Sequence, residues 1–318
     1  VLAVHRITLP FAGRRGANWA AGALALCPTL VAYVPALMTE GLASSGLMVA
    51  GWLALAQRGT RRWPAAVGLV SLGVLLGGLV LVRPQLLLLV PVLGAIAGGR
   101  GLGRAAGTGL LVTLLALGTC LPWTLRNCER MGSCLLVSAN GGWNLLIGTA
   151  PQGKGAWVPL EQIGVPTECR EVFQEAAKDA CFGAAARRRI AASPAAWLAL
   201  VPAKLSATFD DVGGPSWYLA AAAPQHFPES TRVPLNVAEW LWSRAALGLA
   251  ALGLGRQRTW SRFKLAGWVG GVTLLAAAAN WLATLLVALV ALRAPDSRAR
   301  PPLGLFAAVV LATAATHA

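Results

Sequence analysis

Charged residues are scarce in this chain of 318 residues: they make up 12% of it, against 56% hydrophobic residues, and the mean hydropathy is +0.62. A soluble globular domain carries about twice that share of charge. The clearest stretches without any charged side chain are 65–82, 105–121 and 265–292. Eighteen helical residues are about 27 Å long, which matches the hydrocarbon thickness of a bilayer. The composition therefore argues against a soluble protein and predicts an all-α, polytopic transmembrane helical bundle.

Acidic residues are scarcer than basic ones: 12 Asp and Glu face 27 Lys and Arg, and the net charge is +15. Most of the acids lie between residues 124 and 239. The basic excess lies in short clusters between apolar runs, at 14–15, 58–62, 100–104 and 256–264. Short loops rich in Lys and Arg stay on the cytoplasmic side of a membrane. The basic charge therefore indicates topology and excludes the need for a nucleic-acid partner.

The apolar runs between these clusters are predicted to cross the membrane in alternating directions. They are 17–36, 41–57, 65–82, 85–97 and 105–121, and the last one ends at Pro122-Trp123. With the basic clusters inside, Glu40, Arg83 and the stretch that begins at Pro122 all lie on the outer face.

Residues 124–237 are too polar for lipid and are predicted to form a large, mixed extracytoplasmic loop region. Within it we expect a helix over 168–192 and an interfacial helix over 194–209. The chain is thus divided into transmembrane helices at 1–123, this loop region, and C-terminal transmembrane helices at 238–318. In the last part, residues 265–292 fit either one long tilted span or two short ones around Asn280.

The chain also lacks an initiator methionine and the layout of a signal peptide. It begins with Val1, its first methionine is Met38, and its opening residues read as the end of an earlier span followed by a basic loop. We therefore expect the natural chain to begin further upstream.

Histidine is rare, with three residues, and the six cysteines do not have the spacing of zinc ligands, so neither a zinc site nor a Cys–His catalytic pair is expected. Cys27 and Cys120 lie in apolar runs and are interpreted as packing residues. The other four cysteines lie in the predicted outer loop region, an oxidising environment. Proximity favours the pairs Cys128–Cys134 and Cys169–Cys181. No P-loop, HExxH or GxSxG motif is present, so nucleotide and protease chemistries have no support.

Three ionisable residues at the predicted membrane boundary are candidates for function. Glu40 is a carboxylate whose position is costly unless it has a role or a partner, although it also fits a solvated turn. Arg83 lies in "LVRPQ", where Pro84 ends a helix; it fits either a ligand or an arginine that reaches from lipid to the interface. Lys204 lies in an apolar stretch, where it either meets a lipid phosphate or extends to water.

A second group of candidates follows Pro122. Arg126 has a planar fork suited to phosphate oxygens, and Asn127 is next to it. "SANGGWNLLIG" adds Asn140 and Asn144 around two glycines, which suits sugar hydroxyls or a simple turn. Taken together, cations and amides on one membrane face predict an anionic, lipid-linked ligand.

The stretch "PWTLRNCERMGSCLLVSANGGWNLLIGTAPQGKGAW" resembles the bacterial GT-C membrane glycosyltransferases of the family 39 or ArnT-like type. The shared pattern is Pro-Trp, two residues, Arg-Asn, and then Ser-x-Asn-Gly-Gly-x-Asn-Leu. Other stretches resemble the same family in the same order: "LCPTLVAYVPALMTEGL", "GLVLVRPQLLLLVP", "AASPAAWLALVPAKL" and "DSRARPPLGLF".

The resemblance implies a multi-pass enzyme of the bacterial inner membrane. It would transfer a sugar from a polyprenyl-phosphate donor to a lipid, glycan or protein acceptor on the extracytoplasmic face. The residue roles that it implies are a catalytic-site acid at Glu40, donor-phosphate binding by Arg83, Arg126, Lys204 and Arg298, and a sugar pocket shaped by Asn127, Asn140 and Asn144. The principal catalytic acid of the family lies in an earlier loop and has no counterpart here. The resemblance leaves a divalent metal open and favours one span over 265–292.

Two other functions are weighed against this one. An O-antigen ligase or polymerase would show a long, late outer loop with paired arginines, whereas the large loop here lies in mid-chain. A transporter or a structural membrane protein would show charged or broken helices at the membrane midplane, whereas the polar residues here gather at one face.

Overall fold

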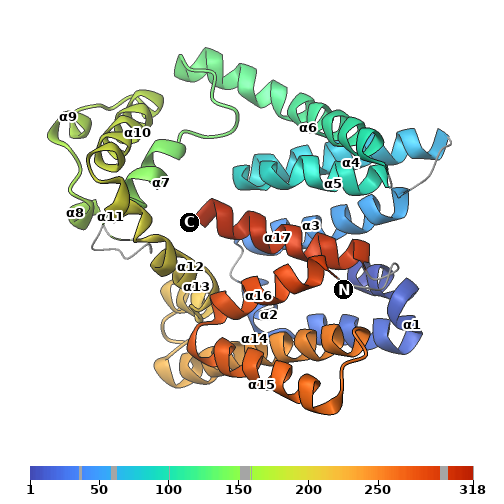
Figure 1. Cartoon of the computed structure of the whole chain (residues 1–318). Helices are drawn as coiled ribbons and strands as arrows, with labels where there is room; N and C mark the ends of the chain where they lie inside the picture. Colours follow the sequence, from blue (N-terminus) through green and yellow to red (C-terminus); the bar gives the residue numbers. More distant parts are fainter. Residues whose placement is uncertain are drawn as a thin grey trace. The chain divides into compact units, whose positions relative to one another are not determined.

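The structure is a computed structural model that describes residues 1–35, 38–58, 63–99, 101–150, 158, 160–293 and 300–317. Every element in these ranges is a helix, which confirms the all-α class (Figure 1). The helices group into two compact units. The first comprises Val1–Ala116 with Asp210–Thr313, and the second is formed around Leu117–Phe209. We describe each unit by itself.

The first unit contains eleven elements in its described part. They are α1 (Leu2–Ala25), α2 (Pro28–Tyr33), α3 (Thr39–Gln57), α4 (Trp63–Val82), the 3-10 helix η1 (Pro84–Leu89), α5 (Val90–Gly98), α13 (Gly214–Ala222), α14 (Glu229–Gln257), α15 (Arg262–Ala278), α16 (Asn280–Leu292) and α17 (Arg300–His317). The long helix α6 (Leu102–Met131) begins in this unit and ends in the second.

Helices α3 and α4 form an antiparallel hairpin whose ends match the predicted topology. Glu40 in the first turn of α3 meets Arg83, which follows the last residue of α4. The predicted run 17–36, by contrast, is not one continuous helix. The chain breaks at Cys27 because Pro28 lacks an N–H donor and starts a new helix, α2.

Helix α6 is longer than predicted, because it does not end at Pro122-Trp123. It continues through Pro122 for more than two further turns, to Met131. A proline inside a helix removes one hydrogen bond, and side chains beyond it can hold the helix together. Here those side chains bind the segment that returns after the helix, as described below.

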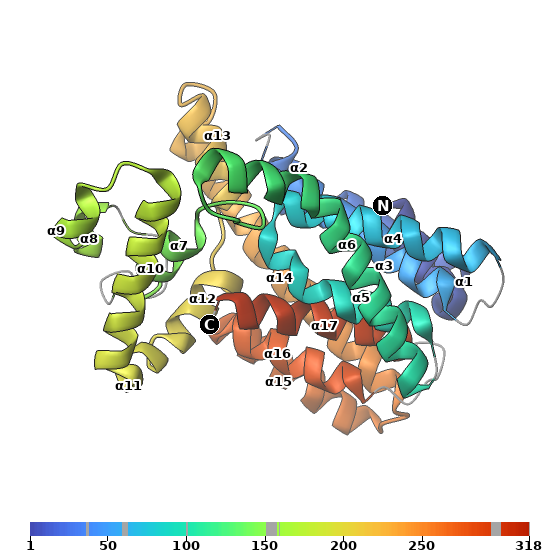
Figure 2. The same ribbon diagram turned by 90° about the horizontal axis from the view of Figure 1, so that it is seen from above.

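The apolar stretch 265–292 is two helices, so the single span that the family resemblance favours is wrong. Ala279 has extended backbone angles (φ −152°, ψ 86°) between α15 and α16. The Arg258 guanidinium, just before α15, donates to the carbonyls of Val290 and Arg293 at the end of α16. The two helices therefore run antiparallel, and with α14 they enclose a core of small and aliphatic side chains. Figure 2 shows the ribbons of α14, α15 and α16 in one region of the molecule.

Glycines let α5 and α6 pack backbone against backbone. A β-carbon added to Gly94 would lie 2.9 Å from the Cα of Gly109, and one added to Gly98 would lie 2.9 Å from the carbonyl oxygen of Arg104. Gly94 and Gly98 are four residues apart, which is the spacing of small residues at helix contacts in membranes.

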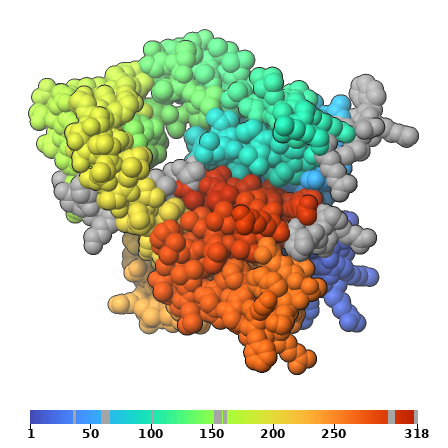
Figure 3. Space-filling view, viewed as in Figure 1, coloured from blue at the N-terminus to red at the C-terminus, as the bar shows by residue number. Residues whose placement is uncertain are grey.

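One helix in the described part of the chain, α6, is long and apolar enough to cross a membrane. The bent pair of α10 with α11–α12 would make a second if it were counted as one span. Only 22% of the most apolar window of α6 is buried, and the space-filling view shows this helix at the surface (Figure 3). A core helix of a soluble protein would be mostly buried.

The described part of the second unit holds the end of α6, the longer helix α10 (Glu175–Ala192) and the short helices α7 (Gly141–Ile147), α8 (Leu160–Ile163), α9 (Thr167–Arg170), α11 (Pro194–Leu198) and α12 (Val201–Phe209). The helix predicted over 168–192 is thus split at residues 171–174, and its end before Ser193-Pro194 is confirmed. The predicted loop region extended to 237, but residues 210–237 belong to the first unit, where α13 packs on α2 and α14.

Replacing Gly94 by Ala should destabilise the protein by about 1–3 kcal/mol, because the added methyl group forces α5 and α6 apart. Gly107→Ala in α6 is the matched control, since a β-carbon there meets no atom within 4 Å. Ala is the better helix former, so this control should be neutral or slightly stabilising. Thermal unfolding in detergent measures both, and equal melting temperatures for the two variants would contradict the proposed contact.

Candidate functional site

Glu40 and Arg83 form an ion pair at one end of the first unit. Arg83 Nη2 donates to Glu40 Oε1, and Arg83 Nε donates to Thr39 Oγ1 at 3.1 Å. Both charged side chains are about 30% exposed. Glu40 Oε2 is buried and has no hydrogen-bond partner among the described residues. Two of the predicted site residues are therefore brought together, and one carboxylate oxygen is left available.

An apolar cavity of about 1110 Å³ lies beside this pair. Its wall comes from α1, α2, α3 and α17 and includes Tyr33, Met38, Gly41 and Leu42. Met38 and Gly41 flank Thr39 and Glu40 in the chain, whereas the ion-paired residues Glu40 and Arg83 are not among the residues that line the cavity. The cavity is thus apolar, and the first turn of α3 contributes both to its wall and to the ion pair.

Asn127 holds the segment that returns after α6. Its side chain is fully buried; Nδ2 donates to the carbonyls of Leu135 (2.9 Å) and Val137 (3.1 Å), and Oδ1 accepts from Arg126. Every polar atom of the amide therefore has a partner within the protein. The sugar-pocket role that the resemblance implies for this residue stays a prediction.

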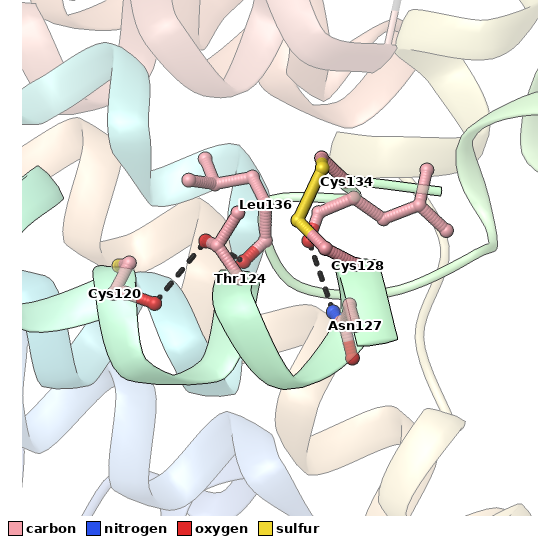
Figure 4. The surroundings of a disulfide bond; sticks show 7 residues. Cys120, Thr124, Asn127, Cys128, Cys134 and Leu136 are labelled. Atoms are coloured by element: carbon pink, nitrogen blue, oxygen red, sulfur yellow. Dashed lines mark hydrogen bonds between the residues drawn. A yellow bond between two sulfur atoms is a disulfide. The ribbon is translucent and has the colours of Figure 1, made fainter. Parts of the chain in front are cut away.

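Two more residues of the "PWTLRN" motif, Trp123 and Thr124, bind the same returning segment. Trp123 Nε1 donates to the Val137 carbonyl at 2.7 Å, and Thr124 Oγ1 donates to the Leu136 carbonyl at 3.1 Å. Three successive carbonyls of the returning segment are thus bound by one face of α6. Figure 4 shows Thr124 and Asn127 on this face, with the Cys128–Cys134 disulfide next to them. Arg126 is exposed on the same helix, and its guanidinium lies 4.7 Å from the Trp123 ring centroid.

The second glycine of "ANGGWN", Gly142, serves helix packing. The carboxylate of Asp179 in α10 accepts from the backbone N–H groups of Gly142 (3.0 Å) and Trp143 (2.9 Å) at the start of α7. A β-carbon on Gly142 would overlap the Asp179 carbonyl. Asn140 and Asn144 are exposed, which leaves both side chains accessible to a ligand.

Lys204 is the most buried cation among the predicted site residues, with 7% of its surface exposed. Its ammonium lies 4.8 Å from the Trp197 ring centroid, and a β-carbon on Gly148 would lie 3.7 Å from Nζ. Burial lowers the pKa of the Lys204 ammonium below its usual value. The structure thus keeps a lysine in an apolar setting where an anion would stabilise its charge.

Both predicted disulfides are present. Cys128 is joined to Cys134 beside the end of α6, and Cys169 is joined to Cys181 between α9 and α10. Cys169 belongs to the apolar core of the second unit, together with Leu146 and Phe182. The free cysteines are Cys27 and the buried Cys120.

Two further predictions about the site concern Arg298 and a bound metal ion. Arg298, assigned to the donor phosphate, lies outside the described residues. Within the described ranges no group of three or more His, Cys, Asp and Glu side chains could hold a metal ion.

Sequence reasoning missed three acidic residues that bind backbone amides. Asp179 caps α7, Asp210 accepts from Trp281 N at the start of α16 (2.7 Å), and Glu239 accepts from Gly213 N (2.8 Å). Glu239 stands at the second residue of the span predicted to start at 238, and a carboxylate inside such a run was the available signal. For Asp179 and Asp210 the sequence held no such signal, because the neighbouring residues do not reveal which distant helix end an aspartate will bind.

The chain matches no protein-family model, no curated protein and no solved structure.

Replacing Asn127 by Ala should destabilise the second unit by about 2–4 kcal/mol, because the three hydrogen bonds of a fully buried side chain disappear and the part-buried carbonyl of Leu135 loses its donor. Asn140→Ala and Asn144→Ala, at exposed positions, should change stability by less than about 0.5 kcal/mol. The measurement is denaturant unfolding followed by tryptophan fluorescence under non-reducing conditions. A stable Asn127→Ala variant would show that the motif has another purpose.

Proposed function

We propose that this chain is part of a GT-C-type glycosyltransferase of the bacterial inner membrane that takes its sugar from a polyprenyl-phosphate donor on the extracytoplasmic face. The observation that carries the proposal is the Glu40–Arg83 pair beside the large apolar cavity. A charged group next to an apolar chamber suits a ligand with an anionic head and a long hydrocarbon chain. The "PWTLRN…SANGGWN" stretch adds the resemblance in sequence.

A membrane location is supported by the surface of α6 and by its contact with α5. A helix of 30 residues is about 45 Å long, which exceeds the hydrocarbon core of a bilayer. Its side chains at Leu110, Leu114 and Leu121 are all more than half exposed. Lipid would cover such a surface, whereas exposure of these leucine side chains to water has a high free-energy cost. The other spans of a multi-pass protein belong to the proposal.

The extracytoplasmic side is supported by the two disulfides. Disulfides persist in oxidising compartments and are rare in the cytosol. Both lie in the second unit, and Cys128–Cys134 lies between Arg126 and Asn140 in the chain. In the proposed orientation the basic clusters around Arg58 and Arg262 face the cytoplasm.

The proposed chemistry is displacement of polyprenyl phosphate from the anomeric carbon by an acceptor hydroxyl. Negative charge grows on the phosphate as the carbon–oxygen bond breaks, and fixed cations in a site of low dielectric stabilise it. Arg83 is the candidate cation in the first unit, and Arg126 and Lys204 are the candidates in the second unit.

The first role that we propose for Glu40 differs from the catalytic one that the resemblance implies. Because one of its oxygens is bound by Arg83, its first role is to orient that guanidinium. Its buried Oε2 keeps the capacity to accept a proton or a hydroxyl hydrogen bond. Removal of the proton from the acceptor would otherwise fall to an acid outside this sequence.

Arg83→Gln should lower sugar transfer by about 100-fold, the effect of removing one donor to a developing anion. Arg83→Lys should retain part of the activity, because the charge stays but the second donor is lost. The assay follows radiolabelled glucose, mannose, galactose or arabinose from polyprenyl phosphate in membranes containing the protein expressed from its complete reading frame. Arg262→Gln, at an exposed residue of α15, is the control and should be fully active.

Two results would argue against this function. Full activity of the Arg83→Gln variant would show that Arg83 does not bind the donor phosphate. Absence of transfer from every polyprenyl-phosphate sugar, with the protein folded and in the membrane, would favour a transporter or a structural protein instead.

A further inference from the structure

The two disulfides of the second unit differ in their exposure. Cys134 is an exposed residue, and Cys128 is half-buried near the end of α6. Cys169, in contrast, is fully buried in the apolar core of this unit, and Cys181 packs against that core. An external thiol reacts only with a disulfide whose sulfur it can reach. The first disulfide is therefore the more open to attack, and Cys134 is the residue that an incoming thiol meets.

The fold also holds the two cysteines of the exposed pair together without help from their covalent bond. Gly132 has φ +63°, a conformation that favours glycine, and it lets the chain turn back directly after α6. The side chains of Trp123, Thr124 and Asn127 then donate to the carbonyls of residues 135–137 over distances of 2.7–3.1 Å. These bonds fix the returning segment immediately after the second cysteine of the pair.

A contact with α10 fixes the end of α6 as well. Gln174 caps α10, because its Oε1 accepts from the Ala177 backbone N–H at 2.6 Å, and its Nε2 donates to the carbonyl of Met131, the last residue of α6. Hydrogen bonds within the second unit thus anchor both the last turn of α6 and the segment that follows it. If the disulfide opens, the two thiols stay close to each other and the bond can form again.

We propose that Cys128–Cys134 is a redox-active disulfide, which a partner protein carrying two thiols opens by thiol–disulfide exchange, and that Cys169–Cys181 is a structural one. A partner thiolate attacks Sγ of Cys134, the bond between the two Sγ atoms breaks, and Cys128 leaves as a thiolate. The second partner thiolate then attacks the partner's sulfur in the mixed disulfide and releases Cys134 as a thiolate. The partner loses two electrons and two protons and becomes a disulfide, and the two cysteines gain them. This reaction does not depend on sugar transfer.

The test measures how fast each disulfide opens in the full chain in detergent, with the free cysteines Cys27 and Cys120 replaced by Ala. Reduced dithiothreitol is the probe, and the thiols are trapped with a maleimide and located by peptide mass spectrometry. Cys128–Cys134 should open at least about 100-fold faster than Cys169–Cys181, because a disulfide in a core reacts mainly in the small fraction of molecules whose core has opened. In oxidised dithiothreitol the opened pair should close again.

A thiol that acts alone identifies the sulfur that is attacked. With reduced glutathione and an acid quench, mass spectrometry should find glutathione on Cys134, the exposed residue of the pair. An adduct that lies mainly on Cys128 would contradict the proposed direction of attack.

A second measurement tests whether hydrogen bonds keep the opened pair together. Asn127→Ala removes the donor to residues 135 and 137, and it should lower the equilibrium constant for closure by dithiothreitol about 10-fold. Asn140→Ala, at an exposed residue beyond the segment, is the matched control and should close as the wild type does. If Asn127→Ala does not fold, wild-type protein unfolded in urea replaces it and should lose at least about 10-fold in the same constant.

Two further results would overturn the inference. If both disulfides open at the same rate, the exposed pair has no special access and Cys128–Cys134 is structural as well. If the pair opens first but closes no better in the folded chain than in the unfolded one, the fold does not hold the thiols together. Either result leaves the proposed glycosyltransferase function untouched, because that function is tested by sugar transfer.

Discussion

The structure depends on one constraint: other helices do not cover the apolar surface of α6. A hydrocarbon solvent would cover it at no cost, and it would also remove the usual reason for apolar side chains to pack together. Helix contacts must then come from close approach and from polar bonds. Both are visible: Gly94 and Gly98 let backbones touch, and few polar side chains are fully buried.

Those few buried or half-buried polar groups satisfy the ends of helices and fix the site at the same time. Asp210 binds the start of α16, Asp179 binds the start of α7, and Glu239 binds the loop before α13. In a membrane, backbone groups without water must find partners inside the protein. Such partners hold helix ends in defined positions, as the Glu40–Arg83 pair does for the facing ends of α3 and α4.

The sequence predicted the helical class, the placement of Glu40 and Arg83 at the same ends of their apolar runs, and both disulfides, because each follows from a local pattern: apolar length, charge clusters or short cysteine spacing. It left one span or two short ones around Asn280 open, and the family resemblance then favoured one, because Asn280 alone does not reveal that Asp210, 70 residues earlier, caps a new helix. The sequence did not reveal the contacts of Asn127 either. An amide suits a sugar as well as a backbone carbonyl, and only the structure shows the carbonyls of the returning segment at 135–137 that it binds.

The orientation of the two units across a membrane tests the account most directly. Cysteines placed at the exposed residues Ser138 and Arg262, in protein with Cys27 and Cys120 changed to Ala, are treated with a membrane-impermeant maleimide. The account predicts that Ser138→Cys is labelled on intact cells and that Arg262→Cys is labelled only after the membrane is opened. Labelling of Arg262→Cys on intact cells, or release of the protein from membranes by alkaline carbonate, would contradict it.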